Sequence, residues 1–356
     1  MRPPFFLYGG TMKYYQDNGY IDMTKIVRDR YPFTFVIHGR ATGKTYGTLK
    51  MCLDKQLRFI FMRRTQSQAD LISRDDFSPF KPLMDDDPSL LLTSQPLNKY
   101  VTGVYHASRS ESGKLQPEGS AIGYICALST ISNLRGFSLE DVDIMIFDEF
   151  IPERHERLIR AEGDALLNAY ETVNRNRELK GRKPLQLLCL SNANTISSPI
   201  FETLNVIDRV DRMIRTGKQE YFDDQRGIAI YLLKDSPISD RKSETSLYKA
   251  TRETDFQKMA LANEFSSDHF TYIRRQPIEE YRPVATYEDI CIYRHKANKG
   301  IWYISRHKSG TVPAYTTDPF STKKFRRDFL PMFDALIRGN VSFEDYYTKN
   351  VLTSAL

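Results

Sequence analysis

Short apolar runs and helix-compatible stretches alternate along residues 31–200. Apolar runs of strand length occur at 33–37, 58–62, 143–149 and 185–190, whereas 45–53 and 158–180 are compatible with helices. Alternating strands and helices predict a sheet of mostly parallel strands with helices on its faces. Two runs near 100–106 and 121–128 alternate apolar and polar residues around a Gly- and Ser-rich stretch, and predict antiparallel strands added to that sheet.

The pattern changes beyond Pro199. Residues 201–250 are charged and broken, and we interpret them as a linker subdomain. From about residue 251 there is helical sequence to 264, and later two strand-like runs flank the turn at 297–300, which indicates a hairpin. The predicted organisation is an α/β domain over 1–205, a linker subdomain over 206–250 and a smaller α+β domain over 251–356.

The first strand run leads into a loop that ends in Gly43-Lys44-Thr45, and helical sequence follows. This order is typical of a phosphate-binding loop, where backbone N–H groups and a helix N-terminus face the phosphates of ATP. Lys44 would reach the β- and γ-phosphates, and the Thr45 hydroxyl would hold Mg²⁺. His38 replaces the usual first glycine, which is the one departure from the motif. The loop residues expected to bind nucleotide are Gly39, Arg40, Ala41, Thr42, Gly43, Lys44 and Thr45.

Two further strand ends carry side chains that suit the same chemistry. Asp148 ends a buried-type strand and is predicted to hold Mg²⁺, whereas Glu149 directly after it is the candidate general base that activates water. Asn192 follows the next strand and could sense the γ-phosphate. Ligands of such a sheet bind at the carboxyl ends of its strands, so these side chains are expected to form one site. The sequence therefore predicts hydrolysis of ATP with Mg²⁺.

Several arginines are candidates for a second catalytic role. A cation from a neighbouring subunit commonly stabilises the transition state of phosphoryl transfer. Arg175, near the end of the predicted helix at 158–180, is our first candidate for such a finger, and Arg177 is the second. Arg40 is an alternative from the same subunit. Arg63 and Arg64 follow a strand end and could face either nucleotide or DNA.

The segment 291–327 combines positive charge with aromatic residues. Basic groups bind phosphates and exposed aromatic rings stack on bases, so this composition favours a sequence-independent nucleic-acid surface. The alternative is an aromatic core beneath an ordinary charged surface. The candidate cations are Arg294, Lys296, Lys299, Arg306, Lys308, Lys323, Lys324, Arg326 and Arg327, and the interleaved aromatic residues are Tyr293, Trp302, Tyr303, Tyr315, Phe320 and Phe325.

Composition excludes some classes of protein. The 356 residues carry a net charge of +6, which is compatible with a nucleic-acid partner. There is no apolar run of about 18 residues, so no membrane partner is expected. The four Cys residues form no Cys-x-x-Cys pair and the six His residues show no metal-ligand spacing, so reduced thiols and no metal besides the Mg²⁺ of the nucleotide are expected.

Five segments of the chain resemble those of a known family. The chain is similar to the DNA-packaging ATPases, or encapsidation proteins, of small short-tailed phages with protein-primed genomes, and more distantly to the large terminase subunits of tailed viruses. The resemblance covers residues 30–200 well and the remainder weakly. It is carried by His38–Thr45, Phe59–Arg64, Ile146–Ile151, Asn174–Glu178 and Cys189–Ala193.

This resemblance implies a P-loop NTPase domain of the ASCE type and a C-terminal RNase H-like domain. It implies a homomeric ring, expected to be a pentamer, that acts in the host cytoplasm, docks transiently on the portal of a preformed capsid and drives double-stranded DNA inward. It also implies that Arg175 is the trans-acting finger. A packaging RNA is a further candidate partner, although such an RNA need not occur in every relative.

The C-terminal domain is expected to have lost nuclease activity. Two-metal cleavage needs several converging carboxylates, and the hairpin at 290–306 carries cations instead. Two other functions stay open from the sequence. A helicase-type ATPase would carry further helicase motifs, which we do not find, and a P-loop switch or scaffold without turnover would not need Glu149.

Overall fold

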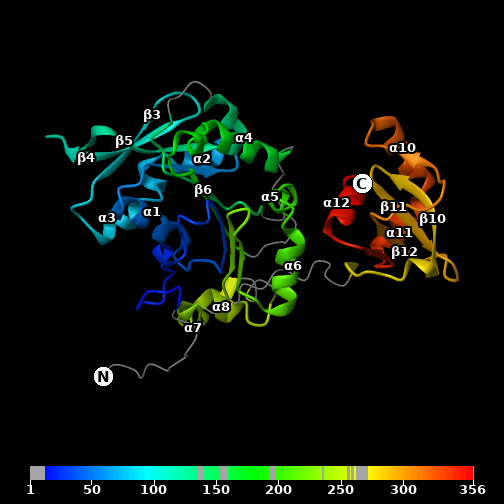
Figure 1. Ribbon diagram of the computed structural model, residues 1–356. Coiled ribbons are helices and arrows are strands. Elements are labelled where there is room, and N and C mark those ends of the chain that lie inside the picture. The colour runs from blue at the N-terminus through cyan, green and yellow to red at the C-terminus, as the bar shows by residue number, and fades with distance from the viewer. Residues whose placement is uncertain are drawn as a thin grey trace. The chain divides into compact units, whose positions relative to one another are not determined.

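The computed structural model describes residues 13–134, 139–152, 159, 161–192, 198–234, 236–254, 257, 260–261 and 272–355. It separates into two compact units, Met1–Ser266 and Ser267–Leu356. Each unit has its own sheet (Figure 1).

The first unit is built on a nine-stranded sheet with the order β3-β4-β5-β2-β6-β7-β1-β9-β8. The neighbouring strands from β5 to β9 in this order are parallel, whereas β3 and β4 at one edge and β8 at the other add antiparallel pairings. The predicted parallel sheet with its antiparallel addition is confirmed. The strands are β1 Phe33–Ile37, β2 Phe59–Arg63, β3 Leu92–Pro96, β4 Thr102–Arg109, β5 Leu115–Ala127, β6 Ile144–Asp148, β7 Gln186–Ser191, β8 Glu220–Asp223 and β9 Ile228–Leu232.

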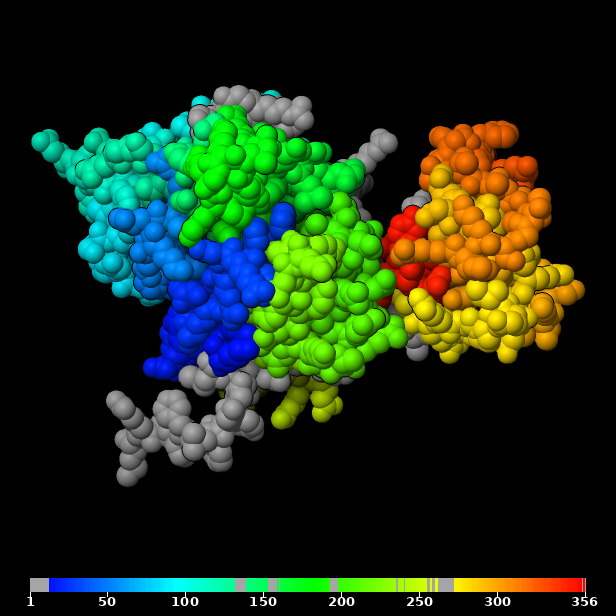
Figure 2. Space-filling view, in the orientation of Figure 1, coloured from blue at the N-terminus to red at the C-terminus, as the bar shows by residue number. Residues whose placement is uncertain are grey.

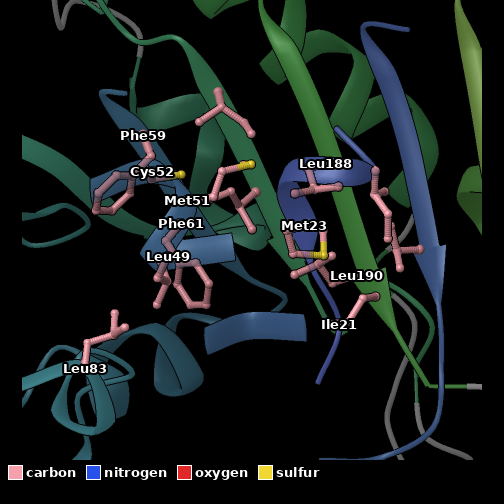
Figure 3. Packing of buried hydrophobic residues seen from close by; sticks show 14 of the residues in the cluster. Ile21, Met23, Leu49, Met51, Cys52, Phe59, Phe61, Leu83, Leu188 and Leu190 are labelled. Carbon is pink, nitrogen blue, oxygen red and sulfur yellow. The ribbon is translucent and has the colours of Figure 1, made fainter. Parts of the chain in front are cut away.

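Successive side chains of a strand point to opposite faces of the sheet, so neighbouring residues of one strand pack into different clusters. Val36 of β1 belongs to a core that contains Leu49 of the following helix, and Figure 3 shows this core with Leu188 and Leu190 of β7. Phe35 instead packs against Phe201, with ring centroids 5.4 Å apart. The helices of this unit are α1 Lys44–Asp54, α2 Gln66–Ile72, α3 Lys81–Asp86, α4 Glu162–Asn174, α5 Pro199–Thr203, α6 Ile207–Thr216, α7 Pro237–Ser243 and α8 Ser246–Ala250.

Residues 206–250 are not a separate linker in the structure. They supply α6 and the strands β8 and β9, and β9 pairs with β1 in parallel along its whole length. The segment looks broken in sequence because β8 is only half-buried at the sheet edge and α6 exposes a charged face. The apolar run at 228–232 is the signal that was missed, since all five residues are buried.

Two predicted helices differ in extent from the observed ones. The helix expected over 158–180 is α4, which ends at Asn174 and is followed by a turn and a short 3₁₀ segment at Glu178–Lys180. Of the helix expected over 251–264, residues 251–254 form a turn instead, and residues 255–256, 258–259 and 262–264 lie outside the described residues.

The second unit contains a five-stranded sheet with the order β13-β10-β11-β12-β14. Its central strands form an antiparallel meander, β13 pairs in parallel with β10, and β14 pairs in parallel with β12. The predicted hairpin is confirmed as β11 and β12. The elements are β10 Tyr281–Tyr287, β11 Ile290–His295, β12 Trp302–Ser305, β13 Ala314–Tyr315, α10 Pro319–Asp328, α11 Leu330–Ile337, β14 Val341–Phe343 and α12 Tyr346–Ser354.

Within the part of the chain that the structure describes, none of the helices has the length and apolar character needed to cross a bilayer.

Candidate nucleotide site

A cleft of about 480 Å³ lies at the carboxyl ends of β1, β6 and β7. Gly43 adopts a φ of 90°, in the left-handed region that favours glycine, and α1 begins at the next residue. The first turn of α1 therefore offers its free N–H groups beside the loop, as anion binding requires. The lining residues are Arg40, Ala41, Thr42, Gly43, Lys44, Thr45, Tyr46, Pro79, Pro82, Asp148, Glu149, Ser191 and Asn192.

Lys44 lies buried at the base of the loop. Its Nζ donates to the carbonyl oxygens of His38 (2.9 Å) and Gly39 (2.7 Å) and to Oδ1 of Asn192 (3.0 Å). Burial lowers the pKa of Lys44 to about 7, although the nearby charge of Asp148 acts in the opposite direction. The structure thus brings the lysine and the amide of two separate strand ends into direct contact.

The acid pair faces both Thr45 and a cation. The hydroxyl of Thr45 donates to Oδ2 of Asp148 at 3.1 Å, so the two groups expected to hold Mg²⁺ lie together, and both offer the oxygen ligands that this ion prefers. Arg63 at the end of β2 donates from Nη1 to Asp148 (2.8 Å) and from Nη2 to Glu149 (2.6 Å). Arg63 therefore faces the acid pair of the cleft.

Arg64 also points into the protein interior. Its side chain is buried, forms an ion pair with buried Glu162 and donates to the carbonyl oxygens of Glu149 and Phe150. The contacts of Arg63 and Arg64 could not be predicted from the sequence, because they depend on β2 lying beside β6.

The first half of the phosphate loop is bound by residues that follow β9. His38 is fully buried, with Nδ1 2.8 Å from the carbonyl oxygen of Leu233, and burial lowers its pKa to about 3. A Cβ atom on Gly39 would lie 2.8 Å from the carbonyl oxygen of Ala260, which accepts a hydrogen bond from the N–H of Arg40. Lys242 of α7 donates to the carbonyl oxygen of Arg40. Gly39 therefore permits a close backbone approach, which the sequence alone did not indicate.

The two candidate fingers differ in burial and in contacts. Arg177 is buried, donates to the carbonyl oxygens of Leu139 and Glu140, and has its pKa lowered by burial. Arg175 is 37% exposed and adopts a left-handed conformation at the end of α4, with Nη1 3.6 Å from Oε1 of Glu140. Only Arg175 has the exposure that contact with another subunit requires.

Arg175 lies far from the cleft of its own chain. The first residue of α4, Glu162, contacts Arg64 beside the acid pair, and the last, Asn174, accepts a hydrogen bond from Leu185 just before β7. The 13 residues of α4 extend about 20 Å at a rise of 1.5 Å per residue. Arg175 is thus at the opposite edge of the sheet from the phosphate loop.

The basic segment at 291–327 is less uniform than its composition suggested. Arg294 donates to the carbonyl oxygen of Lys299 and covers Trp302, Arg306 pairs with Asp345, and Arg326 donates to Ala355. Lys308, Lys324 and Arg327 also make contacts within the unit. Within the described residues, the side chains without such a contact are those of Lys296, Lys299 and Lys323.

Five of the six aromatic residues in this segment are buried, so base stacking by them is excluded and they form the core of the unit. The exception is Phe320, which is 79% exposed on α10. Figure 2 shows the orange segment that contains α10 at the surface of this unit.

Comparisons with known proteins agree with this arrangement. A family model described as "Podovirus DNA encapsidation protein (Gp16)" matches residues 112–325, which is more than half of the chain. The chain belongs to this family. Its membership places the protein in phage genome packaging and confirms the resemblance inferred from the five sequence segments.

Individual relatives of this Gp16 family member span most of its length. It is 24% identical over 335 residues to the DNA packaging protein of Bacillus phage phi29, covering 89% of this chain and 91% of that protein. It is 26% identical over 247 residues to the DNA packaging protein of Bacillus phage B103, covering 68% and 67%. A structure of the bacteriophage Phi-29 genome packaging motor assembly matches with a TM-score of 0.65 at 20% identity, covering 94% of this chain and 98% of that one. That likeness supports the same fold, an α/β P-loop unit followed by a smaller sheet unit.

Proposed function

We propose that this protein hydrolyses ATP to drive double-stranded DNA into a viral capsid. The observation that carries the proposal is the convergence of residues from three strand ends, Lys44, Thr45, Asp148, Glu149 and Asn192, in one cleft of about 480 Å³. A cleft of this size accommodates a nucleotide.

The residues divide the chemistry between them. The loop N–H groups and Lys44 would bind the phosphates, and Thr45 and Asp148 would hold Mg²⁺, which neutralises phosphate charge when it is bound. Glu149 would accept a proton from the attacking water. Its carboxylate lies 2.6 Å from Arg63, so it must turn from this arginine before it can act as a base. Asn192 contacts Lys44 and would respond to the loss of the γ-phosphate.

A ring of identical subunits would complete the site. Arg175 lies at the edge of the sheet opposite the cleft and is half-exposed, so it could reach only the cleft of a neighbour. Membership of the encapsidation family and the likeness to a packaging motor assembly support the same arrangement. The portal, the DNA and a packaging RNA are the partners that we propose for this ring.

The second unit is proposed to be a nuclease-like domain that no longer cuts. Strand β11, at the centre of its sheet, and its neighbour β10 carry no carboxylate, and no group of three metal-binding side chains occurs within the described ranges. Exposed Lys296, Lys299 and Lys323 could bind nucleic-acid phosphates without sequence specificity. Its role would be docking to the portal, to DNA or to RNA.

The first test is ATP hydrolysis across protein concentrations, with and without double-stranded DNA. We expect DNA-stimulated turnover that rises cooperatively with concentration and is lost in Glu149→Gln and in Arg175→Ala. Lys180→Ala is the matched control, since Lys180 is exposed on the neighbouring turn. Turnover unaffected by Arg175→Ala would remove the finger. Nucleotide binding without turnover would favour a P-loop switch, and strand separation would favour a helicase.

A further inference from the structure

Arg64 and Glu162 form a buried ion pair beside the proposed general base. The two residues are 98 positions apart in the chain, and both side chains are nearly inaccessible to solvent. Arg64 follows the end of β2, whereas Glu162 is the first residue of α4. Glu162 also accepts a hydrogen bond from the N–H of Ile159 at 3.3 Å. The pair therefore joins the end of β2 to the start of α4.

The second amino group of the Arg64 guanidinium donates hydrogen bonds to the main chain. Its Nη2 donates to the carbonyl oxygen of Glu149 at 3.2 Å and to that of Phe150 at 2.9 Å. Glu149 has a φ of 60°, a left-handed conformation that is unfavourable for a residue with a side chain. Strained conformations persist only where the surroundings enforce them. The two hydrogen bonds from Arg64 supply such enforcement at this turn.

The free energy of folding does not explain why an ion pair occupies this buried position. Removing two charges from water costs free energy that their attraction often fails to recover, so a well-packed apolar pair would serve stability equally well. A guanidinium, however, offers several donors in a fixed plane, which lets it bind a carboxylate and two carbonyl oxygens together. A lysine or an apolar side chain cannot reproduce that geometry.

We propose that Arg64 and Glu162 are positioning residues that set the direction of the Glu149 carboxylate through its main chain. Glu162 fixes the guanidinium from α4, and the guanidinium fixes the turn at residues 149–150. This role is separate from that of Arg63, which contacts the carboxylates of Asp148 and Glu149 themselves. The inference rests on the proposed function, because it takes Glu149 as the base for hydrolysis.

The test uses two variants and three measurements. Arg64→Met combined with Glu162→Leu removes both charges together, and Arg64→Lys keeps the charge but loses the planar donors. We expect both proteins to fold and to bind ATP within about 3-fold of the wild type, whereas kcat falls at least 10-fold, in the range seen when an oriented catalytic group is misplaced. Amide hydrogen exchange at residues 149–151 is expected to increase at least 10-fold.

The control is Arg338→Met combined with Asp334→Leu, which likewise replaces an arginine with Met and its acidic partner with Leu, but at an exposed ion pair of the second unit. It should change none of the three measurements. Wild-type kcat and wild-type exchange at 149–151 in Arg64→Lys would overturn the proposal and leave the pair with a purely structural role. If the wild type itself shows no turnover, the proposed function fails, and exchange at 149–151 still decides whether the pair holds the turn.

Discussion

The candidate nucleotide cleft and the basic segment at 291–327 were both predicted as functional surfaces. The structure brings the predicted residues of the cleft together but separates those of the basic segment. The cleft residues come from distant parts of the chain, and Lys44, Asn192 and Asp148 are brought together. The residues at 291–327 are close in sequence, yet most of their cations bind their own unit and most of their aromatic rings are buried.

The difference has a physical cause. Carboxyl ends of parallel strands must meet at one edge of a sheet, so polar residues at those ends converge whatever their separation in sequence. A run of alternating cationic and aromatic residues on strands and helices instead divides its members between the core and the surface. Chemistry at strand ends is therefore a stronger indication of a site than local composition.

The sharpest test of the cleft is removal of the Lys44 charge. Because its ammonium group would face the charge that develops on the phosphates, Lys44→Met should lower kcat at least ~100-fold, the loss typical of an oriented transition-state donor. Steady-state hydrolysis at saturating ATP measures this. Lys50→Met is the matched control, since Lys50 lies on the same helix with an exposed side chain paired to Asp54. Retention of more than a tenth of the activity would contradict the role of Lys44.

Protonation of Lys44 gives the next largest effect. The pKa is about 7 in the folded chain against an ordinary value of 10.5. Between these values the unfolded chain binds more protons, so the free energy of unfolding rises with pH; the destabilisation is complete below pH 7 and absent above about 10.5. From pH 7 to pH 9 we expect the wild type to gain roughly 2 kcal/mol relative to Lys44→Met, at ~1.4 kcal/mol per unit. Urea unfolding at both pH values measures the difference, and equal pH dependence of the two proteins would exclude the lowered pKa.

The sequence allowed much of the cleft to be predicted, and the reason lies in local signals. The strand before the loop, the loop itself and the acids after β6 each have a pattern that needs no knowledge of distant residues. The positions of Arg63, Arg64 and Arg177 depended on which element lies beside them, which no local pattern encodes. The strand β9 was missed for a related reason, because its apolar run stands between charged segments.

Gly39 lies in the half of the loop that contacts the segment after β9. A Cβ atom at this position would lie 2.8 Å from the carbonyl oxygen of Ala260, so Gly39→Ala should lower the free energy of unfolding by about 1–3 kcal/mol, as overpacking does elsewhere. Denaturant unfolding measures this loss. Gly300→Ala is the control, because its Cβ would meet only the side chain of Asn298 at 3.3 Å. Equal stability of both variants would show that residue 260 moves aside without cost.

The smallest effects are expected where the cations of the second unit are exposed. The exposed side chains of Lys296, Lys299 and Lys323 form no hydrogen bond, ion pair or ring contact within the described residues, so each can release counterions by binding a phosphate. Replacing all three with Gln should weaken double-stranded DNA binding several-fold at low salt and reduce the salt slope by up to about 3, roughly one for each lost contact. Fluorescence anisotropy across salt concentrations measures both quantities.

The matched control for this surface replaces cations that already have partners. Arg294 is held over Trp302 and Arg306 is held by Asp345, so Arg294→Gln and Arg306→Gln should change the salt slope less than the exposed lysines do. If the two sets of substitutions change the salt slope equally, DNA binding depends on the total positive charge of the segment and not on which cations already have a partner. If neither set changes the slope, this unit does not bind the DNA backbone through these residues, and its proposed docking role would rest on the portal or on RNA.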